Sequence, residues 1–206
     1  VKVGEGWWYP SYVKELCPGL PDYKALNNCA SLFSSKDSNS KGVFITGPKI
    51  WNKQDKLRIL ALKMNFVVLN MENTNQIWIK LKEAIIKRKP IIIFNWTPNF
   101  VEALYEGEFI NFPKYDDLCF SDPSWGSNPN LTHDCGNPKD GFIKIGVNEN
   151  FKKNHKKAYT IATKIKFTNM DIAQMSNYIK SDGMEVDFAA ERWLAENEVR
   201  WKEWIE

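Results

Sequence analysis

Residues 43–98 read VFITGPKIWNKQDKLRILALKMNFVVLNMENTNQIWIKLKEAIIKRKPIIIFNWTP, and this stretch decides the fold. Three apolar segments of strand length alternate there with two segments in which apolar residues have helical spacing. The expected strands are residues 43–46, 66–70 and 91–95, and the expected helices are residues 54–63 and 74–87. A β-α-β-α-β order predicts parallel strands joined by right-handed crossovers. The stretch therefore predicts an α/β domain with a parallel-core sheet flanked by helices.

The segments after this stretch are less regular. Short strands are predicted at residues 109–112 and 141–147, and residues 113–138 between them form a long loop rich in Pro, Asn and Asp. Loops of that length are usually functional or held by disulfides. The rest is predicted to be helical, and apolar residues of the segment 190–205, three tryptophans among them, fall on one helical face. We interpret that face as a packing surface.

Composition disfavours several classes of protein. The chain has 28 Lys and Arg against 25 Asp and Glu, so it lacks the concentrated basic charge expected of a nucleic-acid binder. Its apolar runs are far shorter than the 18 or so residues that cross a bilayer. It carries no serine-hydrolase elbow, Walker loop, dinucleotide fingerprint or zinc-protease motif. Its histidines, His133 and His155, lie in a loop and in a charged run. Nothing here points to catalysis, a cofactor or a metal.

Four cysteines form two local pairs, Cys17 with Cys29 and Cys119 with Cys135, and each pair brackets a loop rich in turn residues. Four cysteines allow three pairings, and sequence alone does not choose among them. We favour local closure, because turn residues can bring the ends of each loop together. Reduced thiols are the alternative, and a zinc site is less favoured because only His133 could add a ligand near a cysteine. Disulfides would fit an oxidising compartment.

Two tryptophans stand where predicted strands end. Trp51 follows a strand and a Gly-Pro turn, and Trp96 closes the strand at 91–95. In an open parallel sheet, ligands bind outside the carboxyl ends of the strands. Two indoles there can form walls around a quaternary ammonium, each contributing about 0.5–2 kcal/mol, and backbone N–H groups around Asn52 and Lys53 can hold a carboxylate. The pattern predicts a zwitterion site, and ordinary core packing of both indoles is the alternative.

Five segments of the chain carry a recognisable resemblance. They are GWWYPSYVKELCPGLPDYKALNNCA (6–30), FNWTPNFV (94–101), DPSWGSNP (122–129), DCGNPKDGFIK (134–144) and ERWLAENEVRWKEWI (191–205). Together they resemble the glycine betaine/proline betaine substrate-binding proteins of ABC importers, including the periplasmic, cysteine-bearing branch of that family. The most specific is FNWTPNFV, with its W-T-P at a strand end.

The resemblance implies roles for particular residues. Trp96 and Trp51 are expected to be walls of an aromatic box around the trimethylammonium group of the ligand. The backbone N–H groups of Asn52 and Lys53 are expected to donate to its carboxylate. Trp8 and Trp125, in other matched motifs, are further candidate contacts.

The resemblance also implies the architecture, which is the type II periplasmic binding protein-like α/β fold with two lobes. Residues 1–140 are expected to be lobe two, complete or nearly so, and residues 141–206 the mainly helical returning part of lobe one. The N-terminal part of lobe one, with a third box tryptophan, is expected to lie outside these residues. Because the chain begins Val-Lys-Val, we expect the signal peptide of a periplasmic protein to be absent from it.

The function implied is noncovalent capture of a compatible solute for osmoprotection. The ligand would be glycine betaine or a related quaternary-ammonium compound such as proline betaine or choline. The partners would be the membrane permease and ATPase subunits of an ABC importer, with no nucleic acid involved. Two alternatives stand beside this one, namely a ligand-binding sensor domain for the same compounds and an enzyme that acts on betaines.

Overall fold

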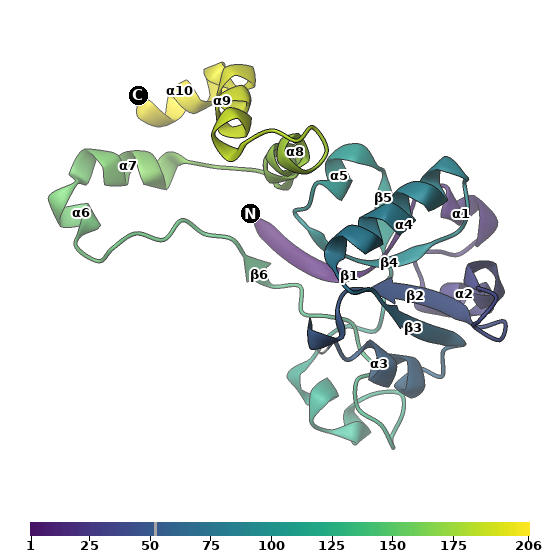
Figure 1. The fold of residues 1–206 in the computed structure, drawn as a ribbon. Helices are drawn as coiled ribbons and strands as arrows, with labels where there is room; N and C mark the ends of the chain where they lie inside the picture. Colours follow the sequence, from purple (N-terminus) through teal and green to yellow (C-terminus); the bar gives the residue numbers. More distant parts are fainter. Residues whose placement is uncertain (52) are drawn as a thin grey trace. The chain divides into compact units, whose positions relative to one another are not determined.

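The computed structural model describes residues 1–51 and 53–206, which form two compact units (Figure 1). Unit 1 comprises Val1–Val3, Thr97–Tyr105 and Asp140–Glu206, and unit 2 comprises Gly4–Trp96 and Glu106–Lys139. The strands are β1 (Lys2–Pro10), β2 (Gly42–Thr46), β3 (Phe66–Asn70), β4 (Ile92–Thr97), β5 (Gly107–Phe109) and β6 (Gly141–Phe142). The α-helices of unit 2 are α1 (Val13–Leu16), α2 (Tyr23–Asn28), α3 (Asp55–Ala61) and α4 (Thr74–Ile86). Its short 3-10 helices are η1 (Ala30–Phe33), η2 (Lys49–Trp51), η3 (Asp117–Phe120) and η4 (Pro123–Trp125). The helices of unit 1 are α5 (Val101–Leu104), α6 (Phe151–Asn154), α7 (Lys156–Lys164), α8 (Asn169–Lys180), α9 (Val186–Glu196) and α10 (Glu198–Ile205).

The sheet of unit 2 has the strand order β3-β2-β4-β1-β5. β2 pairs in parallel with both β3 and β4, so that Ile45 lies opposite Leu69 on one side and Ile93 on the other. The connection from β2 to β3 and the connection from β3 to β4 run in opposite directions across the sheet. Right-handed crossovers then require their helices, α3 and α4, to lie on opposite sides of the sheet, as Figure 1 shows. The predicted parallel-core α/β fold is confirmed.

The N-terminal strand β1 is the element that the β-α-β-α-β pattern did not include. It lies between β4 and β5 in the sheet and pairs antiparallel with β5, with Trp8 opposite Phe109. Its residues Trp7 to Pro10 are all buried, so apolar and polar residues do not alternate along it. Trp7 is fully buried and stacks on Phe44 at a centroid distance of 4.0 Å. This aromatic contact is the centre of the core of unit 2.

Unit 1 has a smaller helical core of its own. Tyr178, Ala189 and Trp193 are buried there, and Phe167 and Trp204 pack against them. A cavity of about 340 Å³ lies in this unit with an almost entirely apolar lining. Its walls are Ile161, Ile165, Phe167, Met175, Ala190, Trp193, Leu194, Trp201, Trp204 and Ile205. The predicted apolar face of the last helical segment is therefore partly a packing surface and partly the wall of this cavity.

Two predicted elements of unit 1 differ in the structure. The strand expected at residues 141–147 is limited to Gly141 and Phe142, which pair with Val3 and Lys2. The single helix expected over residues 190–205 is instead α9 and α10, separated at Asn197, whose backbone leaves the helical region at φ −122° and ψ 30°. Side-chain spacing continues across this break, so the apolar pattern could not reveal it.

Both local disulfides are present, Cys17–Cys29 and Cys119–Cys135. The second closes part of the long loop between β5 and β6. Among the residues that the structure describes, no helix combines the length and apolar character needed to span a membrane.

Candidate functional site

The candidate site lies where β2 and β4 end. These strands are parallel, so their carboxyl ends meet at the same edge of the sheet. Trp96 is the penultimate residue of β4, and Trp51 closes η2, which follows β2 after the Gly47-Pro48 turn. Both indoles are half-buried. The structure thus brings the two predicted box residues to one edge of unit 2.

A glycine at the end of β2 fixes the position of Trp51. A Cβ atom at Gly47 would lie 2.3 Å from Cζ3 of Trp51, so the indole packs where any other side chain would stand. The Gly47 carbonyl accepts a hydrogen bond of 2.9 Å from Nδ2 of Asn70, at the end of β3. The Trp51 amide in turn donates to the Pro48 carbonyl. The turn and the indole are therefore held by the two neighbouring strand ends.

Phe94 joins the two tryptophans. Its ring centroid lies 5.5 Å from that of Trp51, edge to face, and 6.0 Å from that of Trp96. Trp78 of α4 adds a fourth ring, with its centroid 5.5 Å from Trp96. We call these four residues, Trp51, Trp78, Phe94 and Trp96, the aromatic cluster. Neither Trp78 nor Phe94 was among the predicted site residues, although Phe94 stands two residues before Trp96 and so shares its face of the strand.

A cation lies on this cluster. The ammonium of Lys53 is 4.6 Å from the Phe94 ring centroid, and it forms an ion pair of 2.5 Å with the Glu5 carboxylate. The side chains of Lys53 and Glu5 are 28% and 41% exposed, so the pair is partly shielded from water. Asn52, the other predicted donor to a ligand carboxylate, lies outside the described residues.

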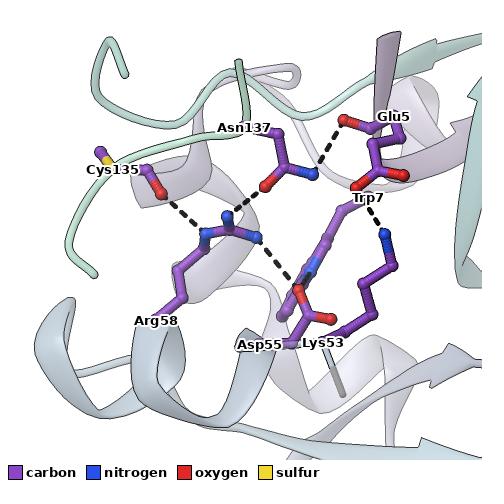
Figure 2. A network of polar contacts seen from close by, with 7 residues as sticks. All are labelled: Glu5, Trp7, Lys53, Asp55, Arg58, Cys135 and Asn137. Carbon is purple, nitrogen blue, oxygen red and sulfur yellow. Dashed lines mark hydrogen bonds and ion pairs between the residues drawn. The ribbon is translucent and has the colours of Figure 1, made fainter. Parts of the chain in front are cut away.

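A buried polar network lies beside this ion pair (Figure 2). Nε1 of Trp7 donates to Oδ1 of Asp55 at 2.8 Å, which ties the start of α3 to β1. The Arg58 guanidinium donates to the same carboxylate at 3.0 Å and to the Cys135 carbonyl at 2.7 Å. It also donates to Oδ1 of Asn137. One arginine thus ties α3 to the loop that carries the second disulfide.

The network and the Lys53–Glu5 pair join the same two chain segments. Asp55 is two residues after Lys53, and Trp7 is two residues after Glu5, so the two contacts run side by side between residues 5–7 and 53–55. The buried hydrogen bond fixes the relative position of the two segments. It therefore also positions the Lys53 ammonium over the aromatic cluster.

Burial dominates the electrostatics of the network. It raises the pKa of the Asp55 carboxyl above its ordinary value, and the Arg58 charge and the Trp7 N–H only partly offset this. Burial also lowers the pKa of the Arg58 guanidinium. Both side chains are less than a tenth exposed and are satisfied by neutral partners as well as by each other. This arrangement is that of a structural ion pair.

The other predicted site residues lie elsewhere in unit 2. Trp8 is 2% exposed, and it alternates along β1 with Trp7, whose side chain packs in the core that contains Phe94. Successive side chains of a strand point to opposite faces, so Trp8 points to the face of the sheet opposite that of Trp7 and Phe94. Trp125 is half-buried in η4, on the disulfide-bearing loop. The structure therefore brings Trp51, Lys53 and Trp96 together around Phe94.

Burial, with the Arg58 charge nearby, lowers the pKa of His133, the histidine of this loop, below its ordinary value. Within residues 1–51 and 53–206, no group of three or more His, Cys, Asp or Glu side chains is arranged to hold a metal ion.

Known proteins resemble the chain in sequence and in fold. A trimethylamine N-oxide-binding protein of Pelagibacter ubique (strain HTCC1062) is 36% identical over 204 residues, a match that covers 96% of this chain and 62% of that protein. The chain thus spans less than two thirds of the length of this relative.

Solved structures of similar fold include lactococcal OpuAC complexed with glycine betaine, with a TM-score of 0.51 and 19% identity over all of this chain and 68% of that one. An ABC-transporter choline-binding protein in complex with choline has a TM-score of 0.52 and 16% identity, over 99% of this chain and 63% of that one. The glycine betaine/L-proline-binding protein ProX of Borrelia burgdorferi has a TM-score of 0.54 and 14% identity, over all of this chain and 66% of that one. These likenesses show the type II periplasmic binding protein-like fold.

The family match covers nearly the whole chain. Residues 2–196 match the family described as the substrate binding domain of the ABC-type glycine betaine transport system, a family of solute-binding proteins and not of enzymes. The chain therefore belongs to this family of substrate-binding domains.

Proposed function

We propose that this chain captures a small solute with a quaternary or fully substituted nitrogen and delivers it to an ABC importer. The observation that carries the proposal is the aromatic cluster, in which Trp51 and Trp96 flank Phe94 at the carboxyl edge of parallel strands. A trimethylated nitrogen has no N–H to donate, so aromatic faces are its natural partners, at about 0.5–2 kcal/mol each. The half-buried indoles leave such faces within reach of a ligand.

The ligand class is supported by the relatives. The Pelagibacter protein is named for trimethylamine N-oxide, and two of the structures of similar fold hold glycine betaine and choline. All three compounds share a trimethylated nitrogen. Glycine betaine is our first candidate, because the chain belongs to a family described by its transport. The carboxylate of that ligand would accept hydrogen bonds from backbone N–H groups at Asn52 and Lys53.

The proposal includes location and partners. Residues 1–140 would be lobe two of the binding protein, and residues 141–206 the returning part of lobe one. The protein would work outside the cytoplasmic membrane, in the periplasm, and would meet permease and ATPase subunits. Closure of the lobes on the ligand would present the surface that the permease recognises.

A titration tests the proposal. Indole N–H resonances of the ¹⁵N-labelled chain are followed while glycine betaine, trimethylamine N-oxide or choline is added, since this detects millimolar as well as micromolar binding. We expect the Trp51 and Trp96 signals to move in a saturable way with at least one ligand. Trp96→Ala should weaken binding at least tenfold, whereas Trp201→Ala, a matched change of a half-buried indole in unit 1, should not. Unmoved indole signals with all three ligands, or unchanged affinity in Trp96→Ala, would refute the proposal.

A further inference from the structure

The Lys53 ammonium lies beside the indoles that are proposed to hold the ligand cation. It lies 4.6 Å from the centroid of Phe94, the ring that joins Trp51 and Trp96. The Phe94 ring therefore contacts the Lys53 ammonium as well as both indoles. We propose that the Lys53 side chain selects the charge class of the ligand, favouring zwitterions and disfavouring compounds that carry only a positive charge. This inference rests on the proposed function, because it concerns the same site.

The position of the ammonium is fixed by two contacts. The Glu5 carboxylate pairs with it directly, and the buried bond between Trp7 and Asp55 ties the same two segments together two residues further along. A lysine on an open surface samples many positions and is strongly screened. Lys53 is instead held over an aromatic face with about a quarter of its side chain exposed. Its charge therefore acts at a defined point of the site.

That charge has opposite effects on two kinds of ligand. A second monocation brought to the indoles is repelled by the ammonium, because like charges at this separation repel each other. A zwitterion brings an anionic oxygen as well, which can accept a hydrogen bond from the ammonium and share it with Glu5. For unit charges about 6 Å apart in a partly exposed site, the Coulomb energy corresponds to a factor of about three to ten in affinity. The Glu5 carboxylate, 2.5 Å from the ammonium, offsets part of the repulsion of a monocation, so the lower end of this range is expected.

Glycine betaine and choline are a matched pair of probes. Both carry a trimethylammonium group, and they differ in whether the other end is a carboxylate or a neutral hydroxyl. The quantity that matters is the ratio of the two affinities, since a general loss of packing weakens both ligands and leaves the ratio unchanged. The ratio therefore isolates the effect of charge from the effect of folding.

The test compares three variants with the parent chain by indole N–H titration. Lys53→Met removes the charge and keeps the aliphatic length, and we expect it to lower the preference for glycine betaine over choline about threefold. Lys53→Arg keeps the charge and should preserve most of that preference. Lys49→Met removes an exposed lysine of η2 and should leave the ratio unchanged. An unchanged ratio in Lys53→Met, or an equal change in Lys49→Met, would overturn the inference.

A measurement without ligand separates this inference from the proposed function. The ε-CH₂ protons of Lys53 should resonate upfield of those of other lysines because of the Phe94 ring current, and Phe94→Leu should abolish the shift. Absence of the shift in the parent chain would overturn the placement of the charge, whatever binds. Absence of binding by all three solutes, with the upfield shift present, would instead refute the proposed function and the selectivity that depends on it.

Discussion

Replacing Arg58 with methionine should destabilise unit 2 by about 3–5 kcal/mol at pH 7, the usual cost of removing one partner of a buried ion pair. Arg58 and Asp55 are 7% and 8% exposed at their side chains. Among the described residues, Arg58→Met leaves the buried Asp55 carboxylate with the hydrogen bond from the Trp7 N–H and the nearby charge of Lys53. It also removes the donor that the Cys135 carbonyl and the Asn137 amide oxygen share. The loss therefore combines an uncompensated charge with two unsatisfied acceptors.

The sign of the pH dependence follows from Asp55. Burial already raises the pKa of this carboxyl, and loss of the Arg58 charge raises it further. A carboxyl whose folded pKa exceeds its unfolded pKa binds protons more tightly in the folded state. Its stabilising contribution is present below the unfolded value of 3.8 and is lost as the pH rises through the folded value. Arg58→Met should therefore be less destabilised near pH 4 than at pH 7.

Urea unfolding, followed at the Trp7 indole resonance, measures the effect within unit 2. With an m-value of about 2 kcal/mol per molar urea, the midpoint should fall by about 2 M at pH 7. The double variant Asp55→Leu/Arg58→Met should be less destabilised than the sum of its single variants, by at least about 2 kcal/mol, because neither charge is left alone. A loss below about 1 kcal/mol in Arg58→Met, additive single variants, or no dependence on pH would refute this reasoning.

Three further predictions concern other parts of the chain. Burial alone would raise the pKa of the Asp171 carboxyl, but hydrogen bonds and the charge of Arg200 lower it to about 2. The ionised carboxylate therefore contributes about 2 kcal/mol to the stability of unit 1. This contribution should be lost as the pH falls from about 4 to about 2. Asp171→Asn should remove this acid-dependent loss in a denaturation series, and an unaltered profile would contradict it. Replacing both Cys119 and Cys135 with serine removes their disulfide and should lower the free energy of unfolding, measured in urea, by about 3 kcal/mol. An unchanged free energy of unfolding would show that the disulfide does not constrain the unfolded chain. Gly107→Ala should lower the free energy of unfolding by about 1–3 kcal/mol, because its Cβ would stand 1.9 Å from Cζ2 of buried Trp8. A melting temperature equal to that of the parent chain would disprove the clash.

The central β-α-β-α-β part of the fold was predictable because each of its elements has a local signature. The strand at residues 66–70 was predicted with its observed bounds, and the helix expected over 74–87 is α4. Thr74 is its first residue, and its N-cap is Asn73, whose side chain accepts a hydrogen bond from the Gln76 amide. Short polar residues at adjacent positions compete for the same cap, and sequence alone does not decide between them.

Elements that depend on distant partners were harder to predict. β1 has no alternation because its second half is buried on both faces, a property that exists only once the sheet has formed and both of its faces are covered. The candidate site likewise has residues that could be predicted locally and residues that could not. Trp51 and Trp96 were expected at the sheet edge from their places after strands. The ion pair between Lys53 and Glu5 instead joins residues 48 positions apart. Only the folded sheet brings Glu5 to the cluster, so no local pattern could have indicated it.

Phe94 has a consequence for how proteins of this kind change over evolutionary time. It is 4% exposed and belongs to the same buried core as Trp7, while its ring also joins the two half-buried indoles. Truncating a buried phenylalanine costs about 3–5 kcal/mol, a large part of the stability of most domains. Lineages that shift from one solute to another are therefore expected to vary the partly exposed positions around this ring and to leave the ring itself in place. Substrate preference can then drift among descendants without each step endangering the fold.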